Sequence, residues 1–450
     1  MAADGAAAKG AAAAAGADGA AAAGKQQQEP EPQLELPHLS GTIYLDYNAT
    51  TPILPEARDA MLPFTFEQFG NPSSAHAYGR RAAAAVAAAR ASVAKLVGAA
   101  DPSEIYFTSC GTEADAWAIW GAVMARRKEL AGKGALPHVV TTAVEHPAVT
   151  ACLQSLADQG LCTFTAVGVD AEGLVSAEAV AAAVTPETVL VTVMHANNEV
   201  GSIQPVADIS AAIKASGALL HTDAAQSIGK IKVDVRRLAV DMLTIVGHKF
   251  GAPKGVAALY IRKGVSIAPL LSGGGQERGG RAGTESTLLI AGFGAAAEAA
   301  RRDLAAGHKR MRAARDVLQE RLLAGFCALQ AGRGGGGGGV RVNGPADAPR
   351  RLPNTLSISV GGLRAAELLA ALGDRVAASS SAACHSGAGG GGASATLRAM
   401  GVAPELAIGT LRLSTGRFTT MAEAVRAADI ILEAARRQRG GGGLFGGPWF

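Results

Sequence analysis

This 450-residue chain has few aromatic residues and no large excess of positive or negative charge. Only 4% of the residues are aromatic while 48% are hydrophobic, so the core must consist mainly of Ala, Val, Leu and Ile. Lys and Arg exceed Asp and Glu by 42 − 38 = +4, and no long basic block concentrates that excess. The charge pattern therefore indicates neither a nucleic acid nor an anionic membrane as partner. No apolar run approaches the roughly 18 residues that a membrane-spanning helix needs.

Cysteines with the spacing of a disulfide framework or of a metal site are also missing. The five cysteines are odd in number and show no CxxC spacing; they are Cys110, Cys152, Cys162, Cys327 and Cys384. We therefore expect reduced thiols, a cytosolic location and no bound metal.

Composition divides the chain into four parts. Of the first 24 residues, 20 are Ala or Gly, and residues 1–37 contain acidic residues but no Arg, which is atypical of an organelle-import signal. We expect residues 1–37 to be a disordered tail. A large domain over residues 38–305, a small C-terminal domain over 306–438 and a glycine-rich tail over 439–450 follow.

Short apolar runs alternate with helical patterns in the predicted large domain. The runs cover residues 104–108, 138–142, 188–194, 218–222, 242–246 and 256–262. Strands that are continuously apolar and separated by helices predict an α/β fold, in which a mostly parallel sheet is covered on both faces. Ligands of such sheets bind beyond the carboxyl ends of the strands.

Two residues at expected strand ends suggest a specific cofactor. Asp223 ends one run, and Lys249 follows another 249 − 223 = 26 residues later. A lysine at a buried strand end is costly unless its charge is paired or removed, and one way to remove it is a Schiff base. Pyridoxal phosphate needs this lysine and an acid that keeps its ring nitrogen protonated. For Asp223 alone, a helix N-cap is the alternative.

Four further segments could complete a site. The loop Thr108–Glu113 could cradle a phosphate or be an ordinary capped turn. His146 follows the next strand at the same edge. Cys384 lies on a small-residue segment and is either a mobile nucleophile or an ordinary thiol. Arg412 lies inside a strand pattern, where it would bind a substrate carboxylate or form an internal ion pair.

Several ordered motifs resemble the cysteine desulfurase and selenocysteine lyase family of class V pyridoxal-phosphate enzymes. The resemblance runs from about residue 43 to about residue 437 and rests on YLDYNATTP, CGTE, VEH, MHANNEVG, HTDAAQ, TIVGHK, GGGQERGG, SSSAACHS and LRLSTGRFT. It implies fold type I, a large domain with a mostly parallel seven-stranded sheet and a smaller C-terminal α/β domain.

The resemblance also implies a role for each motif residue. Lys249, His146 and Cys384 are expected to be catalytic, with Lys249 holding the cofactor and Cys384 accepting the chalcogen. Arg412 is expected to bind the substrate carboxylate. The expected cofactor contacts are Gly111, Thr112, His146, Asn198, Asp223, Gln226, His248, Lys249 and, from the second subunit of a homodimer, Thr284.

The motifs lie nearest to the branch of the family that acts on selenocysteine. The resemblance therefore implies conversion of L-selenocysteine to L-alanine and selenium, with a possible acceptor protein for the selenium. Desulfuration of L-cysteine through a persulfide on Cys384 is the alternative. Two more distant alternatives are an aminotransferase with the same fold and a non-catalytic scaffold.

Overall fold

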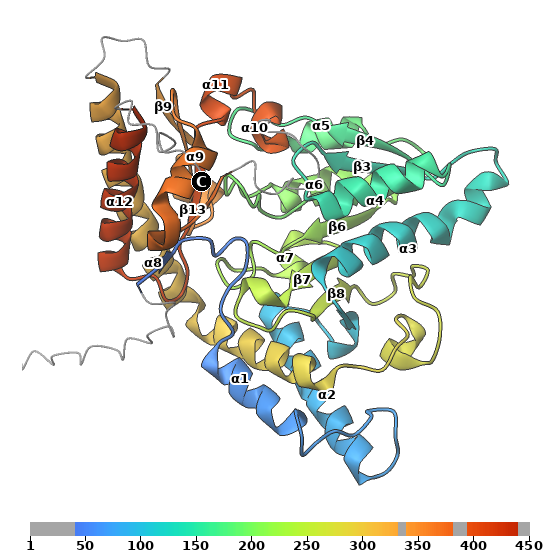
Figure 1. Ribbon diagram of the computed structural model, residues 1–450. Coiled ribbons are helices and arrows are strands. Elements are labelled where there is room, and N and C mark those ends of the chain that lie inside the picture. The colour runs from blue at the N-terminus through green and yellow to red at the C-terminus, as the bar shows by residue number, and fades with distance from the viewer. Residues whose placement is uncertain (1–40, 332–338, 381–393, 440–450) are drawn as a thin grey trace, which may run out of the picture. The chain divides into compact units, whose positions relative to one another are not determined.

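A seven-stranded sheet organises the larger part of the computed structural model, which describes residues 41–331, 339–380 and 394–439 (Figure 1). Its strand order is β2-β8-β7-β6-β5-β3-β4. The strands are β2 (Ile105–Thr108), β3 (His138–Thr142), β4 (Thr163–Val167), β5 (Thr188–Thr192), β6 (Leu219–Asp223), β7 (Met242–Val246) and β8 (Ala257–Ile261). The pairs from β7 to β4 are parallel, whereas β8 is antiparallel to both neighbours. The predicted α/β fold with a mostly parallel sheet is confirmed.

Helices cover both faces of this sheet. One face carries α3 (Gly111–Ala131) and α4 (Pro147–Asp158). The other face is covered by α1 (Pro55–Met61), α2 (Ala77–Val97), α5 (Ala177–Ala182), α6 (Val206–Ile213), α7 (Val235–Leu238) and the first half of α8 (Thr287–Ala331). Because helices cover both faces, every side chain of β3, β5, β7 and β8 is buried, whereas the edge strand β4 is mostly exposed.

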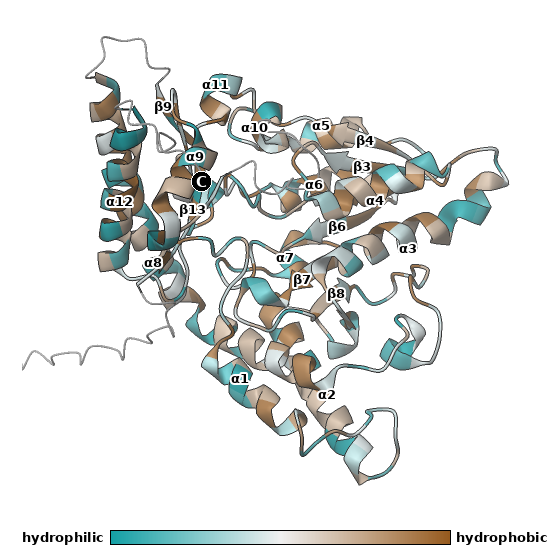
Figure 2. Ribbon diagram, viewed as in Figure 1, coloured by the Kyte–Doolittle hydropathy of each residue, from teal (hydrophilic) through white to brown (hydrophobic). Residues whose placement is uncertain are grey.

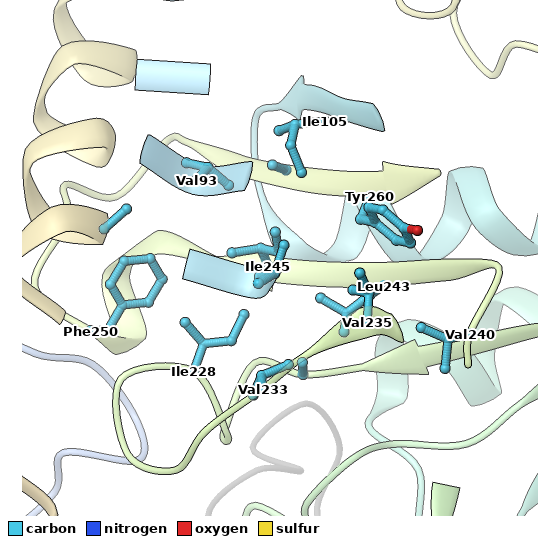
Figure 3. Close-up of a cluster of buried hydrophobic side chains, with 14 of the residues drawn as sticks. Val93, Ile105, Ile228, Val233, Val235, Val240, Leu243, Ile245, Phe250 and Tyr260 are labelled. Carbon is cyan, nitrogen blue, oxygen red and sulfur yellow. The ribbon is translucent and has the colours of Figure 1, made fainter. Parts of the chain in front are cut away.

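The side chains of β7 show how one strand serves both faces. Leu243 and Ile245 point into the cluster drawn in Figure 3, where they lie with Tyr260 of β8 and Val93 of α2. Met242 belongs to the cluster on the opposite face, beneath α3 and α4. This alternation is the two-residue repeat of an extended strand.

A second, four-stranded antiparallel sheet has the order β12-β13-β10-β9. Its strands are β9 (Val340–Asn343), β10 (Thr355–Val360), β12 (Ser379–Ser380) and β13 (Thr410–Ser414). The second half of α8 packs here with α9 (Ala365–Leu372) and α12 (Met421–Arg439), and Figure 2 shows hydrophobic and hydrophilic residues sharing α12. The remaining elements are β1 (Ile43–Tyr44), which pairs with β11 (Val376–Ala377), and the short helices α10 (Ala395–Ala399) and α11 (Pro404–Ala407).

Helix α8 is shared by both sheets. Its residues from Ile290 to Ala300 belong to the core under the large sheet, and those from Ala314 to Phe326 to the core under the small sheet. The expected boundary at residue 305 falls within this helix. The division into two domains therefore stays a prediction. No helix in the described ranges is both long and apolar enough to span a bilayer.

Candidate active site

The acid and the lysine singled out in the sequence lie at one edge of the large sheet. Asp223 is the last residue of β6, and Lys249 ends a single 3₁₀ turn, Gly247–Lys249, that follows β7 directly. Strands β6 and β7 are parallel neighbours in which Asp223 pairs with Thr244. Their carboxyl ends therefore open on the same side, where ligands of such sheets bind.

The amine of Lys249 is held by two backbone carbonyls. Its Nζ donates to the carbonyl oxygens of Asn48 at 2.7 Å and of Ala49 at 2.8 Å. Both acceptors belong to the segment that connects β1 with α1. The backbone at residues 48 and 49 thus orients the amine of Lys249, which follows β7 in the sequence.

Asp223 is buried at the floor of the same edge, with 7% of its surface exposed. Burial raises the pKa of its carboxyl group, while the positive charges of His146 and Lys249 act in the opposite direction. Its Oδ1 accepts the N–H of Ala225 at 2.8 Å within a turn. The next helix, α7, begins only at Val235, so the helix N-cap alternative for Asp223 is wrong.

A layer of uncharged polar groups lies behind Asp223. Burial lowers the pKa of His221 to about 3, and its ring nitrogens contact the hydroxyls of Thr192 at 2.9 Å and Thr244 at 3.0 Å. Asp115 Oδ1 lies 3.8 Å from His221 Nε2. Burial and the charge of Asp223 raise the pKa of Asp115 well above its ordinary value. Both shifts favour the uncharged forms of Asp115 and His221 behind Asp223.

The N-terminus of α3 carries the two residues for which a phosphate contact is expected. Gly111 and Thr112 are the first two residues of this 21-residue helix, whose unpaired N–H groups favour an anion. A Cβ added to Gly111 would lie 2.6 Å from Val246 Cγ2, so the helix end approaches β7 closely. Glu113 accepts the N–H of Ser109 at 2.9 Å and pairs with Arg281 at 2.7 Å. Glu113 thus closes the loop, as the capped-turn alternative expects, although the side chain of the N-cap residue Cys110 makes no capping hydrogen bond, and the phosphate role stays a prediction.

His146 and its neighbour Glu145 follow β3. His146 is exposed, and its Nδ1 accepts the N–H of Ala148 at 3.1 Å at the start of α4. Glu145 directs its carboxylate inward, to the N–H of Met194 at 2.9 Å and the hydroxyl of Thr142 at 2.7 Å. Burial, with a smaller effect of the Asp223 charge, raises the pKa of Glu145 to about 8.

A buried polar hub around Asn48 is absent from the sequence-based predictions. Lys230 donates to Asn48 Oδ1 at 2.9 Å and to Gln226 Oε1 at 2.8 Å, and Gln226 Nε2 donates to the Asn48 carbonyl at 3.0 Å. Asn354 donates to the same Asn48 side chain at 2.9 Å. Burial and the nearby charge of Lys249 lower the pKa of Lys230 far below its ordinary value. The predicted residue Gln226 is thus part of the hub that holds the Lys249 acceptor.

His248 precedes the lysine and is neutral. Its Nδ1 lies 3.1 Å from Thr50 Oγ1, and its carbonyl accepts the N–H of Thr51 at 2.9 Å. Burial and the adjacent charges of Lys249 and Lys254 lower the pKa of His248 to about 4.

Arg412 lies in the middle of β13 and reaches the same region from the small sheet. Its Nη2 donates to Asp46 Oδ1 at 2.9 Å and its Nη1 to the carbonyl of Asn198 at 3.4 Å. The internal ion pair expected as the alternative for Arg412 is therefore present. Asn198 contributes its backbone here and also accepts from Asn48 Nδ2 at 3.1 Å.

Thr284 and Cys384 are the two predicted residues that remain. Thr284 lines a cavity of about 200 Å³ that Thr108, Ser109 and Arg281 of the same chain also line. Cys384 lies outside the described residues. The cysteines within the described ranges are free thiols.

These residues fit pyridoxal phosphate. An amine and a buried carboxylate lie at adjacent strand ends, and a helix N-terminus closes against the end of β7. The carboxylate can pair with the protonated ring nitrogen of the cofactor, and the amine can form a Schiff base with its aldehyde. The N–H groups at the helix end can bind its phosphate.

Comparison with known proteins agrees with this fit. The family "Aminotransferase class-V" matches residues 43–426. A protein named cysteine desulfurase from Trichormus azollae is 42% identical over 398 residues, which cover 88% of this chain and 94% of that protein. Cysteine desulfurase IscS of Clostridium botulinum strain Hall is 40% identical, covering 88% of this chain and 95% of the relative.

Solved structures give the same result. A structure described as a NifS-like protein superposes with a TM-score of 0.77 and 36% identity, covering 88% of this chain and 99% of the other. A structure described as SspA in complex with cysteine has a TM-score of 0.68 and 31% identity, covering 84% and 100%. The chain therefore belongs to the class-V aminotransferase family and is an enzyme that uses pyridoxal phosphate.

Proposed function

We propose that this enzyme is a cysteine desulfurase that converts L-cysteine to L-alanine and retains the sulfur on Cys384. The similarity to relatives named cysteine desulfurase, 42% identical over 88% of this chain, carries the proposal. The solved relative described as a complex with cysteine supports the same substrate. The alternative substrate of the sequence analysis, L-cysteine, thus replaces L-selenocysteine as the preferred one.

When bound, pyridoxal phosphate supplies a conjugated ring that takes up the electron pair released at the substrate Cα. Asp223 would hold the proton on the ring nitrogen, because a buried carboxylate requires a positively charged partner. Lys249 removes the proton from Cα, and the carbonyls of Asn48 and Ala49 orient its amine for this transfer. His146, exposed at the same edge, would lie against the bound ring and would exchange protons with the substrate.

Arg412 binds the substrate α-carboxylate, for which its planar fork is suited. The Cys384 thiolate then attacks the substrate sulfur: the S–S bond forms, the Cβ–S bond breaks, and its electron pair stays with the carbon skeleton. Protonation of that skeleton completes L-alanine. L-cysteine and a thiol thus give L-alanine and a persulfide, with no external oxidant or reductant.

The remaining expectations belong to this proposal. Gly111, Thr112 and His248 bind the phosphate, Gln226 and Asn198 lie near the phenolic oxygen, and Thr284 reaches the phosphate of the second subunit in a homodimer. An acceptor protein would receive the persulfide sulfur. Free thiols fit a reducing compartment, and we propose the cytosol.

Assays of the purified enzyme test the proposal. We expect a chromophore bound through Lys249 and release of L-alanine from L-cysteine without any added keto acid. Cys384→Ala should abolish turnover of L-cysteine while keeping the chromophore, and Lys249→Ala should abolish both. Faster turnover of L-selenocysteine would instead identify a selenocysteine lyase. Full activity of Cys384→Ala together with a keto-acid requirement would identify an aminotransferase, and a colourless protein would identify a scaffold.

A further inference from the structure

The guanidinium group of Arg412 is already engaged by a carboxylate of its own chain. Asp46 Oδ1 accepts from Arg412 Nη2 at 2.9 Å, in a pair whose side chains are only 4% exposed for Arg412 and 18% for Asp46. The carbonyl of Asn198 accepts from Nη1. A substrate carboxylate therefore meets an arginine whose charge is compensated beforehand.

The fold fixes Asp46 at this place from two sides. The segment that precedes α1 runs beside β13, where Asp46 forms an isolated parallel bridge with Ser414 (Figure 1). The second carboxylate oxygen of Asp46 accepts the hydroxyl of Ser379 at 2.9 Å. Ser379 on β12 is the register partner of Arg412 on β13. The carboxylate of Asp46 thus spans two adjacent strands of the small sheet.

The carboxylate of Asp46 stabilises the Arg412 guanidinium while no substrate is bound. A buried guanidinium without a counter-charge is strongly destabilised, so an empty site needs a resident anion. When an amino-acid substrate enters, its carboxylate can replace that anion without leaving Arg412 unpaired. Asp46 tolerates the exchange because its side chain is the more exposed member of the pair and keeps the Ser379 hydroxyl.

We propose that Asp46 determines specificity as an internal competitor, which occupies Arg412 until the α-carboxylate of the substrate takes its place. The inference rests on the proposed function, in which Arg412 binds that carboxylate. Amines without a carboxylate cannot replace Asp46 at the guanidinium and are bound weakly. Selectivity for amino acids then has two sources: the attraction of Arg412 for a carboxylate, and the cost of displacing Asp46 for any ligand that lacks one.

Calorimetric titration of the holoenzyme tests this exchange with two ligands of nearly the same shape. L-alanine carries the carboxylate, and L-alaninamide carries a neutral amide in its place. Asp46→Asn keeps the size of the side chain and removes its charge. We expect the dissociation constant of L-alanine to fall about tenfold, in line with the strength of charge-assisted hydrogen bonds, while that of L-alaninamide stays unchanged.

A matched control separates this effect from a general change in charge. Asp429→Asn removes one negative charge from the exposed pair with Arg321 and should leave both dissociation constants unchanged. Unchanged or weaker binding of L-alanine by Asp46→Asn overturns the inference, as does equal tightening of both ligands. If the Asn variant does not fold, Asp46→Ser carries the same expectation.

Arg412→Gln distinguishes the inference from the function on which it rests. If this variant binds L-alanine as tightly as the unmodified enzyme, the proposed role of Arg412 fails. If Arg412→Gln weakens binding while Asp46→Asn does not tighten it, only the inference about Asp46 fails.

Discussion

Ionisable side chains turned into the fold set the charge pattern of this site, and Glu145 is one whose pKa is raised into the range above neutral pH. Its pKa is raised from 4.5 to about 8 in the folded chain, mainly by burial. A carboxyl group with a raised folded-state pKa binds its proton more tightly when folded. Its stabilising contribution is therefore complete below about pH 4.5 and is lost as the pH rises towards 8.

Glu145→Gln tests this dependence. We expect the stability of the cofactor-free chain to fall with pH relative to the Gln variant, at about 1.4 kcal/mol per pH unit between pH 5 and 7.5. The amide should retain a carbonyl acceptor for the Met194 N–H that Glu145 now accepts. Thermal unfolding of both proteins across this range measures the difference, and a difference independent of pH would show that Glu145 is ionised when folded.

The residues that sequence reasoning missed share one property. Asn48 contacts Lys230, 182 positions away in the chain, and Asp46 contacts the predicted residue Arg412, 366 positions away. A strand pattern locates Asp223 and Lys249 because each follows its own apolar run. The motif YLDYNATTP contains Asn48, but nothing in that segment shows that the elements carrying Lys230 and Lys249 converge on it.

At the scale of elements, the buried strands are the best predicted. The ends of β3 and β7 match the apolar runs at residues 138–142 and 242–246, because every side chain of these strands is buried. Strand β4 is not predicted. It lies at the edge of the sheet, its side chains are mostly exposed, and its sequence TFTAV mixes polar with apolar residues.

The junction between α3 and β7 gives a prediction about cofactor binding. Gly111→Ala brings a methyl group against the buried, branched side chain of Val246, and overpacking of this kind costs about 1–3 kcal/mol. Relief of the clash moves the helix end away from β7. We expect affinity for pyridoxal phosphate to fall about tenfold, as measured by titrating the cofactor-free protein.

Two companion variants check the cause. The double variant Gly111→Ala with Val246→Ala removes the clash and should restore affinity. Gly132 lies at the other end of α3, where an added Cβ comes no closer than 3.4 Å to its neighbours, so Gly132→Ala should bind the cofactor normally. Failure of the double variant to recover would mean that Gly111 is needed for another reason.

At the scale of the whole molecule, the proposed homodimer raises the question of which subunit supplies Thr284 to each phosphate site. This residue lies near Ser109 in a cavity of its own chain, whereas the family resemblance implies that it serves the partner's phosphate. The two arrangements differ in which mixed dimer contains an intact site. Thr284→Glu places a carboxylate against the phosphate, and Lys249→Ala removes the amine, so each change alone should abolish activity.

A mixed dimer of these two chains distinguishes the arrangements. The chain with Thr284→Glu still has Lys249, and it receives an intact Thr284 only if that residue comes from its partner. We expect the mixed dimer, isolated with two different affinity tags, to recover about half of the wild-type activity, because one of its two symmetric sites is complete. If Thr284 served its own chain, both sites would be defective and the mixed dimer would be inactive.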